Sequence, residues 1–226
     1  MLMRSLKTNA SHGRHRASGF SLLEIVTVIA ISLILTVISV MSLVPMMAQQ
    51  RVINAYNTTL SALRQARDNA ISQRTSYSVT FDNTVTPNTI TVAPTLTAFQ
   101  GSQSSVVYTL PTDVQFMTQS QFTTTTAPDS GLGPSFGTGS NAIDFGYTAN
   151  GGTGGQSVIY FCPDGSAQDA EGTAGSCSGS WDNGVVYLSR SGDLMASRAI
   201  SLWGGTGRIH GWRFYANGGG YQWLRQ

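Results

Sequence analysis

Apolar residues dominate one long stretch near the start of the chain, from Phe20 to Val44. Its twenty-five residues include a single charged side chain, Glu24. As an α-helix this stretch is about 37 Å long at 1.5 Å per residue, and the hydrocarbon core of a bilayer is about 30 Å thick. The pattern therefore predicts a helix over residues 20–45 that crosses a membrane once.

The following thirty residues repeat apolar side chains at helical spacing. No glycine or proline occurs from residue 46 to residue 75, and apolar residues recur at intervals of three and four, at Val52, Tyr56, Leu60, Leu63, Ala66 and Ala70. Such a stripe is typical of a helix with one side against a domain. We expect the helix to resume after Pro45 and to run from Phe20 to about Arg74, about 80 Å in all. Its second half, residues 46–75, is then amphipathic.

After Thr75 the apolar period changes to two, which is typical of β-strands. Short apolar runs separated by proline, glycine, asparagine and aspartate lie at residues 77–81, 90–92, 106–108, 114–116, 143–145, 158–161, 185–188, 200–202 and 209–214. About eight to ten strands without a second helix predict an α+β fold, in which the N-terminal helix packs on an antiparallel sheet or sandwich formed by residues 76–226. Three stretches rich in threonine, serine and glycine are expected to be mobile loops: 118–141, 148–156 and 164–184.

Positive charge precedes the apolar stretch. Arg4, Lys7, Arg14 and Arg16 come before it, with no acidic residue among them. Because positive flanks stay in the cytoplasm, the N-terminus is predicted inside and everything after Pro45 outside. Without residues 1–19 the chain keeps 13 − 4 = 9 basic and all 11 acidic residues, a net charge of −2. The basic pI of the whole chain therefore gives no argument for nucleic-acid binding by the remainder.

The inventory of reactive side chains disfavours an enzyme. Lys7 is the only lysine, and after the leader the only histidine is His210. A phosphate-binding lysine loop, a Schiff-base lysine and a multi-histidine metal site are thereby excluded after residue 19. We predict no enzymatic activity, no cofactor and no metal. A membrane-anchored hydrolase that uses His210 stays as an alternative, and it requires a buried imidazole oriented by a carboxylate beside a serine or cysteine.

Glu24 needs a partner if it lies at the head of a membrane span. A carboxylate there costs a few kcal/mol, roughly 2.5–3.5 at the centre and less near the interface. Residues 20–44 offer no lysine, arginine or histidine. A free α-amino group would serve if the chain were cut just before Phe20, because the new ammonium would lie about one helical turn from Glu24 or in reach of a neighbouring subunit's Glu24. The alternative is an interfacial glutamate that faces lipid headgroups.

The residues at this junction carry a resemblance. The basic leader, followed by Gly19, Phe20, Ser-Leu-Leu, Glu24 and the long apolar run, resembles the processing signal of type IV prepilins and type II secretion pseudopilins. The resemblance implies that a prepilin peptidase cuts after Gly19, that Phe20 becomes the N-methylated N-terminus, and that Glu24 acts in assembly. The nineteen-residue leader is long, and Pro45 lies a turn later than the proline of major pilins. A secretory signal cleaved after Ala48 fits less well, because the apolar run is too long.

Two later segments are similar to the GspH/FimT family of minor pilins and pseudopilins. They are Tyr160–Ala167, which contains Pro-Asp-Gly-Ser-Ala, and Gly204–Arg213, which contains Thr-Gly-Arg. The resemblance implies a subunit that acts in filament assembly or initiation and in protein secretion, and that contacts the inner membrane, the prepilin peptidase and other pilins through its N-terminal helix. The resemblance also implies that residues 1–19 are a cleaved leader and that the domain after the span is periplasmic. A type II secretion pseudopilus and a type IV pilus both stay open.

A binding module at the filament tip, for DNA or a secreted substrate, is the main alternative function. Some members of this family bind DNA through a late Gly-Arg-x-Arg motif, to which Arg208, His210 and Arg213 correspond loosely here. Two or three cations give only weak, salt-sensitive binding to DNA. Acidic residues at 164, 169 and 171 offer oxygens for Ca²⁺, but their spacing is not that of an EF-hand.

Two cysteines remain, Cys162 and Cys177, with fourteen residues of loop-like composition between them. A periplasmic location permits a disulfide, which would contribute roughly 3 kcal/mol for a loop of this size. Two free thiols are the alternative. A redox-active pair is not favoured, because the spacing is not Cys-x-x-Cys.

Overall fold

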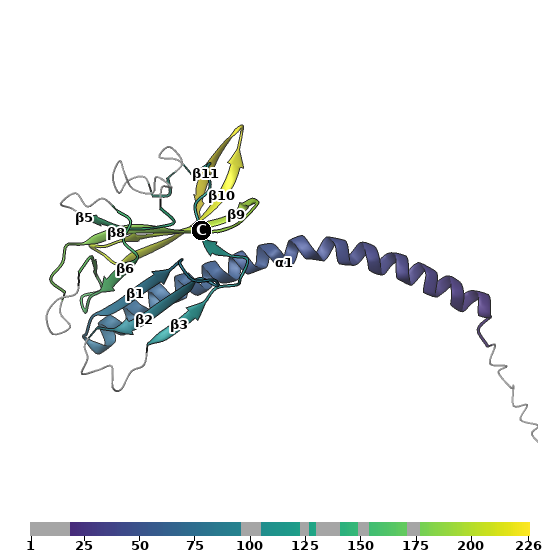
Figure 1. Cartoon of the computed structure of the whole chain (residues 1–226), viewed down its shortest axis with the longest axis horizontal. Helices are drawn as coiled ribbons and strands as arrows, with labels where there is room; N and C mark the ends of the chain where they lie inside the picture. The colour runs from purple at the N-terminus through teal and green to yellow at the C-terminus, as the bar shows by residue number, and fades with distance from the viewer. Residues whose placement is uncertain (1–18, 96–104, 123–126, 130–140, 149–153, 171–176) are drawn as a thin grey trace, which may run out of the picture. The chain divides into compact units, whose positions relative to one another are not determined.

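The computed structural model describes residues 19–95, 105–122, 127–129, 141–148, 154–170 and 177–226 (Figure 1). The chain divides into two compact units, Met1–Val44 and Pro45–Gln226.

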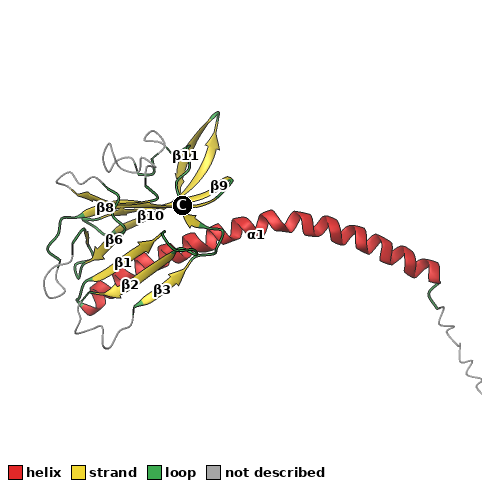
Figure 2. Cartoon of the chain, viewed as in Figure 1, coloured by secondary structure: helices red, strands yellow, loops and turns green. Residues whose placement is uncertain are grey.

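One helix, α1, extends from Leu22 to Gln73 and includes Pro45 (Figure 2). The apolar side chains that the structure describes in the helix before Pro45 are exposed, and the helix is long and apolar enough to cross a membrane. Three hydroxyls in this part donate to backbone carbonyls within the helix: Thr27 to Glu24 at 2.9 Å, Thr36 to Ser32 at 2.7 Å and Ser39 to Leu35 at 2.8 Å. These bonds give polar side chains a partner inside the helix, which matters where lipid offers none.

The part of α1 after Pro45 buries the predicted stripe. Val52, Leu63, Ala66 and Ala70 are fully buried, Tyr56 is nearly so, and Leu60 packs partly buried against the same core. Ala55, Thr59 and Ala62 are buried beside them, whereas polar side chains such as Asn57, Arg64 and Asp68 are exposed, since a helix presents one face every three to four residues. The predicted long helix with an amphipathic second half is therefore confirmed, although the helix begins at Leu22 rather than Phe20.

Two antiparallel sheets complete the Pro45–Gln226 unit, which makes the fold α+β as predicted. The first sheet has the order β3-β2-β1-β6-β7, formed by β1 (Tyr77–Asp82), β2 (Thr89–Pro94), β3 (Val106–Thr109), β6 (Val158–Phe161) and β7 (Ala167–Gln168). The second has the order β11-β10-β9-β8-β4, with β5 also paired to β8, formed by β4 (Gln115–Phe116), β5 (Ile143–Thr148), β8 (Asp182–Arg190), β9 (Asp193–Trp203), β10 (Arg208–Asn217) and β11 (Gly220–Arg225). Among the strands of the described residues, sequence patterning missed β7 and β11.

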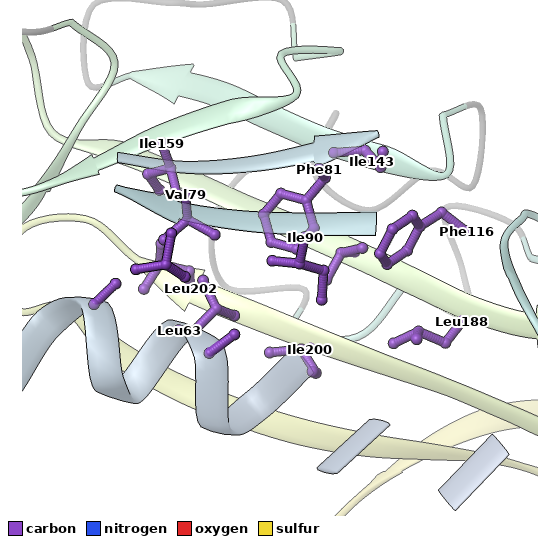
Figure 3. Packing of buried hydrophobic residues seen from close by; sticks show 14 of the residues in the cluster. Leu63, Val79, Phe81, Ile90, Phe116, Ile143, Ile159, Leu188, Ile200 and Leu202 are labelled. Atoms are coloured by element: carbon purple, nitrogen blue, oxygen red, sulfur yellow. The ribbon is translucent and has the colours of Figure 1, made fainter. Parts of the chain in front are cut away.

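The main core lies between the helix and the two sheets. Figure 3 shows Leu63 of α1 beside Ile200 and Leu202 of β9, with Val79 and Phe81 of β1 beyond them. Phe81 also contacts aromatic rings from the second sheet, with centroid distances of 5.6 Å to Phe116 and 5.4 Å to Phe145. Side chains of both sheets thus pack in one core. They come from every second residue of a strand, as the period-two pattern of the sequence predicts.

The opposite face of the second sheet is also buried. The segment that follows β4 lays Phe122 onto it, where the ring packs 5.2 Å from Tyr187 and 5.0 Å from both Phe214 and Trp223. The prediction that 118–141 is a mobile loop is therefore wrong at Phe122, because its apolar side chain covers a sheet face that would otherwise meet water. Residues 123–126 and 130–140 of this stretch lie outside the described residues.

The stretch 164–184 is likewise not a single loop. Ala167 and Gln168 pair with β6, and β8 begins at Asp182. Residues 149–153 and 171–176, which fall in the other predicted loops, lie outside the described part of the chain. Cys162 and Cys177 form a disulfide with a Cα–Cα distance of 5.8 Å, so the predicted bond is present and ties the end of β6 to the segment before β8.

Candidate functional site

The three residues expected to act in processing and assembly lie just before α1 and in its first turn. Gly19 has no heavy atom within 4 Å of where a Cβ would lie, and Phe20 is 78 % exposed. Glu24 lies in the first helical turn. Phe20 and Glu24 line one small hollow on the helix together with Ile25, Val28 and Ile29. Phe20, which processing after Gly19 would make the N-terminal residue, therefore lines the same part of the surface as Glu24.

Glu24 forms no ion pair with any residue that the structure describes. Its position in the first turn is favourable, because the positive end of the helix dipole attracts a carboxylate. That attraction is modest, about 0.3–1 kcal/mol at an exposed site. The Glu24 carboxylate, which lies among exposed apolar side chains, therefore has no cationic partner within the described chain.

Two glycine turns meet at one arginine of α1. In the turn at Pro163–Ser166, the Gly165 N–H donates to the Cys162 carbonyl at 2.8 Å, and Gly165 has φ +82°. In the turn between β9 and β10, Gly207 has φ +59°. Both backbone conformations favour glycine, which has no Cβ to clash.

Arg67 binds both turns at once. Its Nε donates to the Gly165 carbonyl at 3.0 Å, and its Nη2 donates to the Thr206 carbonyl at 3.2 Å. A Cβ at Gly207 would lie 1.9 Å from the Gly165 oxygen and 2.6 Å from Arg67 Nε. The two segments that carry the family resemblance are therefore in direct contact, and the amphipathic half of α1 holds them there.

The three residues named for DNA contact do not form one surface. His210 is only 8 % exposed and its Nδ1 lies 3.0 Å from Asp129 Oδ2, so its ring does not face solvent. Arg208 and Arg213 are both exposed but stand five residues apart on β10, about 17 Å at 3.3 Å per residue. The geometry gives no common cationic track to these three positions.

The Asp129–His210 pair bears on the hydrolase alternative. Asp129 Oδ2 also accepts from Ser201 Oγ at 2.9 Å and from Trp203 Nε1 at 2.6 Å. A serine nucleophile must lie at the imidazole nitrogen opposite the carboxylate, but His210 Nε2 is buried without a hydrogen-bond partner among the described residues. Ser201 instead binds the same carboxylate as the histidine. Within the described chain, this network anchors the segment that contains Asp129 to β9 and β10.

The acidic residues considered for Ca²⁺ are not brought together. Asp164 accepts from the Ser166 N–H at 2.8 Å within its own turn, and Asp169 accepts from the Ser180 N–H at 2.9 Å. Residue 171 lies outside the described residues. No group of three potential metal-ligating side chains occurs in the described ranges.

Asp182 at the start of β8 is a buried carboxyl that the sequence did not reveal. Its side chain has no exposed surface. Oδ1 accepts from the Gly146 N–H at 2.6 Å, whereas Oδ2 has no hydrogen-bond partner among the described residues. Burial raises the pKa of Asp182 to about 7, and the nearby Asp169 carboxylate adds to the rise against the opposing effect of the Gly146 N–H.

We expect Asp182 to make stability depend on pH. Because its pKa is higher in the folded than in the unfolded chain, its contribution is fully present below about pH 4 and is lost as pH rises through about 7. The free energy of unfolding should fall by up to about 1.4 kcal/mol per pH unit within this window. Asp182→Asn should remove that slope, as measured by urea unfolding of residues 46–226 at several pH values.

The matched control for this prediction is Asp68→Asn, which changes an exposed carboxyl on α1. This variant should keep the pH dependence of the wild type. An Asp182→Asn variant with an unchanged slope would show that the buried carboxyl does not titrate in this range.

Sequence reasoning found the residues at the head of the helix but missed those that hold the domain together. Arg67 and Asp129 act through partners 98 and 81 positions away in the chain, Gly165 and His210. Arg67 lies outside the apolar stripe of the helix, and Asp129 follows a proline in a loop. Neither position has a sequence pattern that predicts such distant contacts.

Comparison with known proteins adds no assignment to this geometry. Protein-family models, curated proteins and solved structures were compared with the chain, and none of them matches it.

Proposed function

We propose that this chain is a minor pilin or pseudopilin, a subunit of an envelope filament that acts by assembly rather than by catalysis. The observation that carries the proposal is helix α1. Its part before Pro45 exposes an apolar surface with one carboxylate in the first turn, and its part after Pro45 buries a stripe in an α+β domain.

The physical argument starts from the exposed apolar residues. A helix with this surface is stable in lipid, or against other helices of the same kind, but not in water. The subunit first waits in the inner membrane as a single-pass protein, with the basic leader in the cytoplasm and the β domain in the periplasm. It then leaves the bilayer by packing its helix against the helices of other pilins.

Glu24 supports assembly over simple anchoring. A helix that serves only as a membrane anchor gains nothing from a carboxylate in its apolar surface, because the carboxylate makes the free energy of insertion less favourable. In a helix bundle, the same carboxylate can pair with the α-amino group of a neighbouring subunit and fix the axial register between the two helices. Cleavage after Gly19 by a prepilin peptidase supplies that amine at Phe20.

The experiment is to determine the intact mass and N-terminal residue of the membrane-purified protein, in hosts with and without a prepilin peptidase. We expect a chain that begins at N-methyl-Phe20 in the first host and an uncut chain in the second. A Gly19→Leu variant should stay uncut in both. A chain that begins at Gln49 would make this a secreted soluble protein, and an uncut chain in both hosts would leave a membrane-anchored domain.

A further inference from the structure

A hollow of about 360 Å³ lies where α1 meets the turn between β9 and β10. Arg64, Arg67 and Asp68 line it from the helix, and Thr206 and Arg208 line it from the turn and β10. Three guanidinium groups against one carboxylate give this hollow a formal charge of 3 − 1 = +2. It lies wholly inside the Pro45–Gln226 unit.

The cations of this hollow lack counter-ions within the described chain. Arg64 and Arg208 are exposed and form no ion pair with a described residue. Arg51 and Arg190 differ from them, because each places Nε 3.2 Å from Asp113 Oδ2. Because the three arginines that line the hollow carry the same charge, an anion that enters it is attracted by all three.

The third arginine is held in place before any anion binds. Arg67 uses Nε and Nη2 on the carbonyls of Gly165 and Thr206, and a guanidinium carries five N–H donors in a fixed plane. The oriented guanidinium of Arg67 thus has three N–H groups that form no hydrogen bond with a described residue. An arginine whose orientation is already fixed loses less entropy when it binds a ligand.

We propose that this hollow binds a carboxylate side chain from an acidic segment of a partner protein. A planar guanidinium fork matches a carboxylate in two parallel hydrogen bonds, which makes this pair specific as well as strong. The identity of the partner as another protein of the filament rests on the proposed function. The preference of the hollow for a carboxylate does not depend on that function.

A nucleic-acid backbone fits the same residues less well. Binding to DNA uses cations spread along many phosphates, whereas these three arginines gather in one hollow. Arg213 is about 17 Å further along β10 at 3.3 Å per residue and lies opposite Arg198 on β9. Asp68 also lines the hollow and would repel a closely spaced series of phosphates more than a single carboxylate.

The test uses the full chain in detergent and a fluorescein-labelled hexaglutamate peptide at low ionic strength, with binding followed by fluorescence anisotropy. Arg64→Ala and Arg208→Ala should each weaken binding by about fivefold or more, in keeping with one lost charge-assisted contact. Asp68→Asn should strengthen binding by about threefold, because it removes the one like charge. Arg225→Ala, which removes an exposed arginine on β11 outside the hollow, should leave the affinity unchanged.

Three results would overturn the proposal. The first is no binding of hexaglutamate at millimolar concentration. The second is a loss of affinity in Arg225→Ala equal to that in Arg208→Ala, which would indicate general charge attraction. The third is tighter binding of a twelve-residue oligothymidylate than of the peptide, with a loss of that affinity in Arg208→Ala. Failure of the filament role is seen separately, in the N-terminal residue of the purified protein. If the purified chain began at Gln49 and still bound the peptide, the carboxylate-binding site would be supported and the filament role would be rejected.

Discussion

Glu24→Val should leave the protein in the membrane and reduce its recruitment into filaments by at least about tenfold. The variant replaces the one charge of the apolar stretch by an apolar side chain, which makes membrane insertion more favourable by up to about 2.5–3.5 kcal/mol. It also removes the carboxylate that we propose to pair with a neighbouring subunit's α-amino group. A loss of about 1.4 kcal/mol in that pairing already corresponds to tenfold weaker association.

The measurement is the ratio of tagged protein in the purified filament fraction to that in the inner membrane, determined by quantitative immunoblot. Thr27→Val is the matched control, because it makes a similar change one turn away and removes only a hydroxyl that bonds to the Glu24 carbonyl within the helix. The control should assemble like the wild type. An unchanged ratio in Glu24→Val would remove the assembly role of this glutamate, and equal losses in both variants would point to helix packing instead.

Gly207→Ala should destabilise the Pro45–Gln226 unit by about 3 kcal/mol or more. A Cβ at this position would lie 1.9 Å from the Gly165 carbonyl oxygen, and φ is +59°. The backbone conformation costs a residue with a Cβ about 1 kcal/mol or more, and the overlap with a buried backbone atom adds about 1–3 kcal/mol as the two turns move apart. The movement also lengthens the bonds that Arg67 makes to both turns.

The chain offers a control that separates the two costs. Gly192, in the turn between β8 and β9, has φ +78° but no heavy atom within 4 Å of its Cβ position. Gly192→Ala should therefore cost only about 1 kcal/mol, from the backbone alone. Thermal unfolding of residues 46–226 should show a fall in Tm of about 10 °C for Gly207→Ala, at about 2–4 °C per kcal/mol for a domain of this size. Equal effects of the two variants would contradict the close approach of the turns.

Local patterning predicted the elements of this protein because their signals are contained within a few residues. The stripe from Val52 to Ala70 and the period-two runs after Thr75 identify helix and strands, since burial repeats with the geometry of the backbone. β11 escaped detection because Gly220–Arg225 is half exposed on both faces, with the burial pattern of an edge strand rather than alternation. β7 is two residues long, too short to show a period.

The sequence by itself determined the apolar stretch with its single carboxylate, the Gly19–Phe20 junction, the amphipathic continuation of the helix and the α+β class, because each depends on composition or spacing along the chain. Only the tertiary structure decided that Arg67 joins the turns at Gly165 and Thr206, that His210 is buried against Asp129, and that Asp182 is a carboxyl with a raised pKa. These properties arise from groups brought together from distant parts of the chain. Their energies depend on distance and on exclusion of water, neither of which a one-dimensional pattern contains.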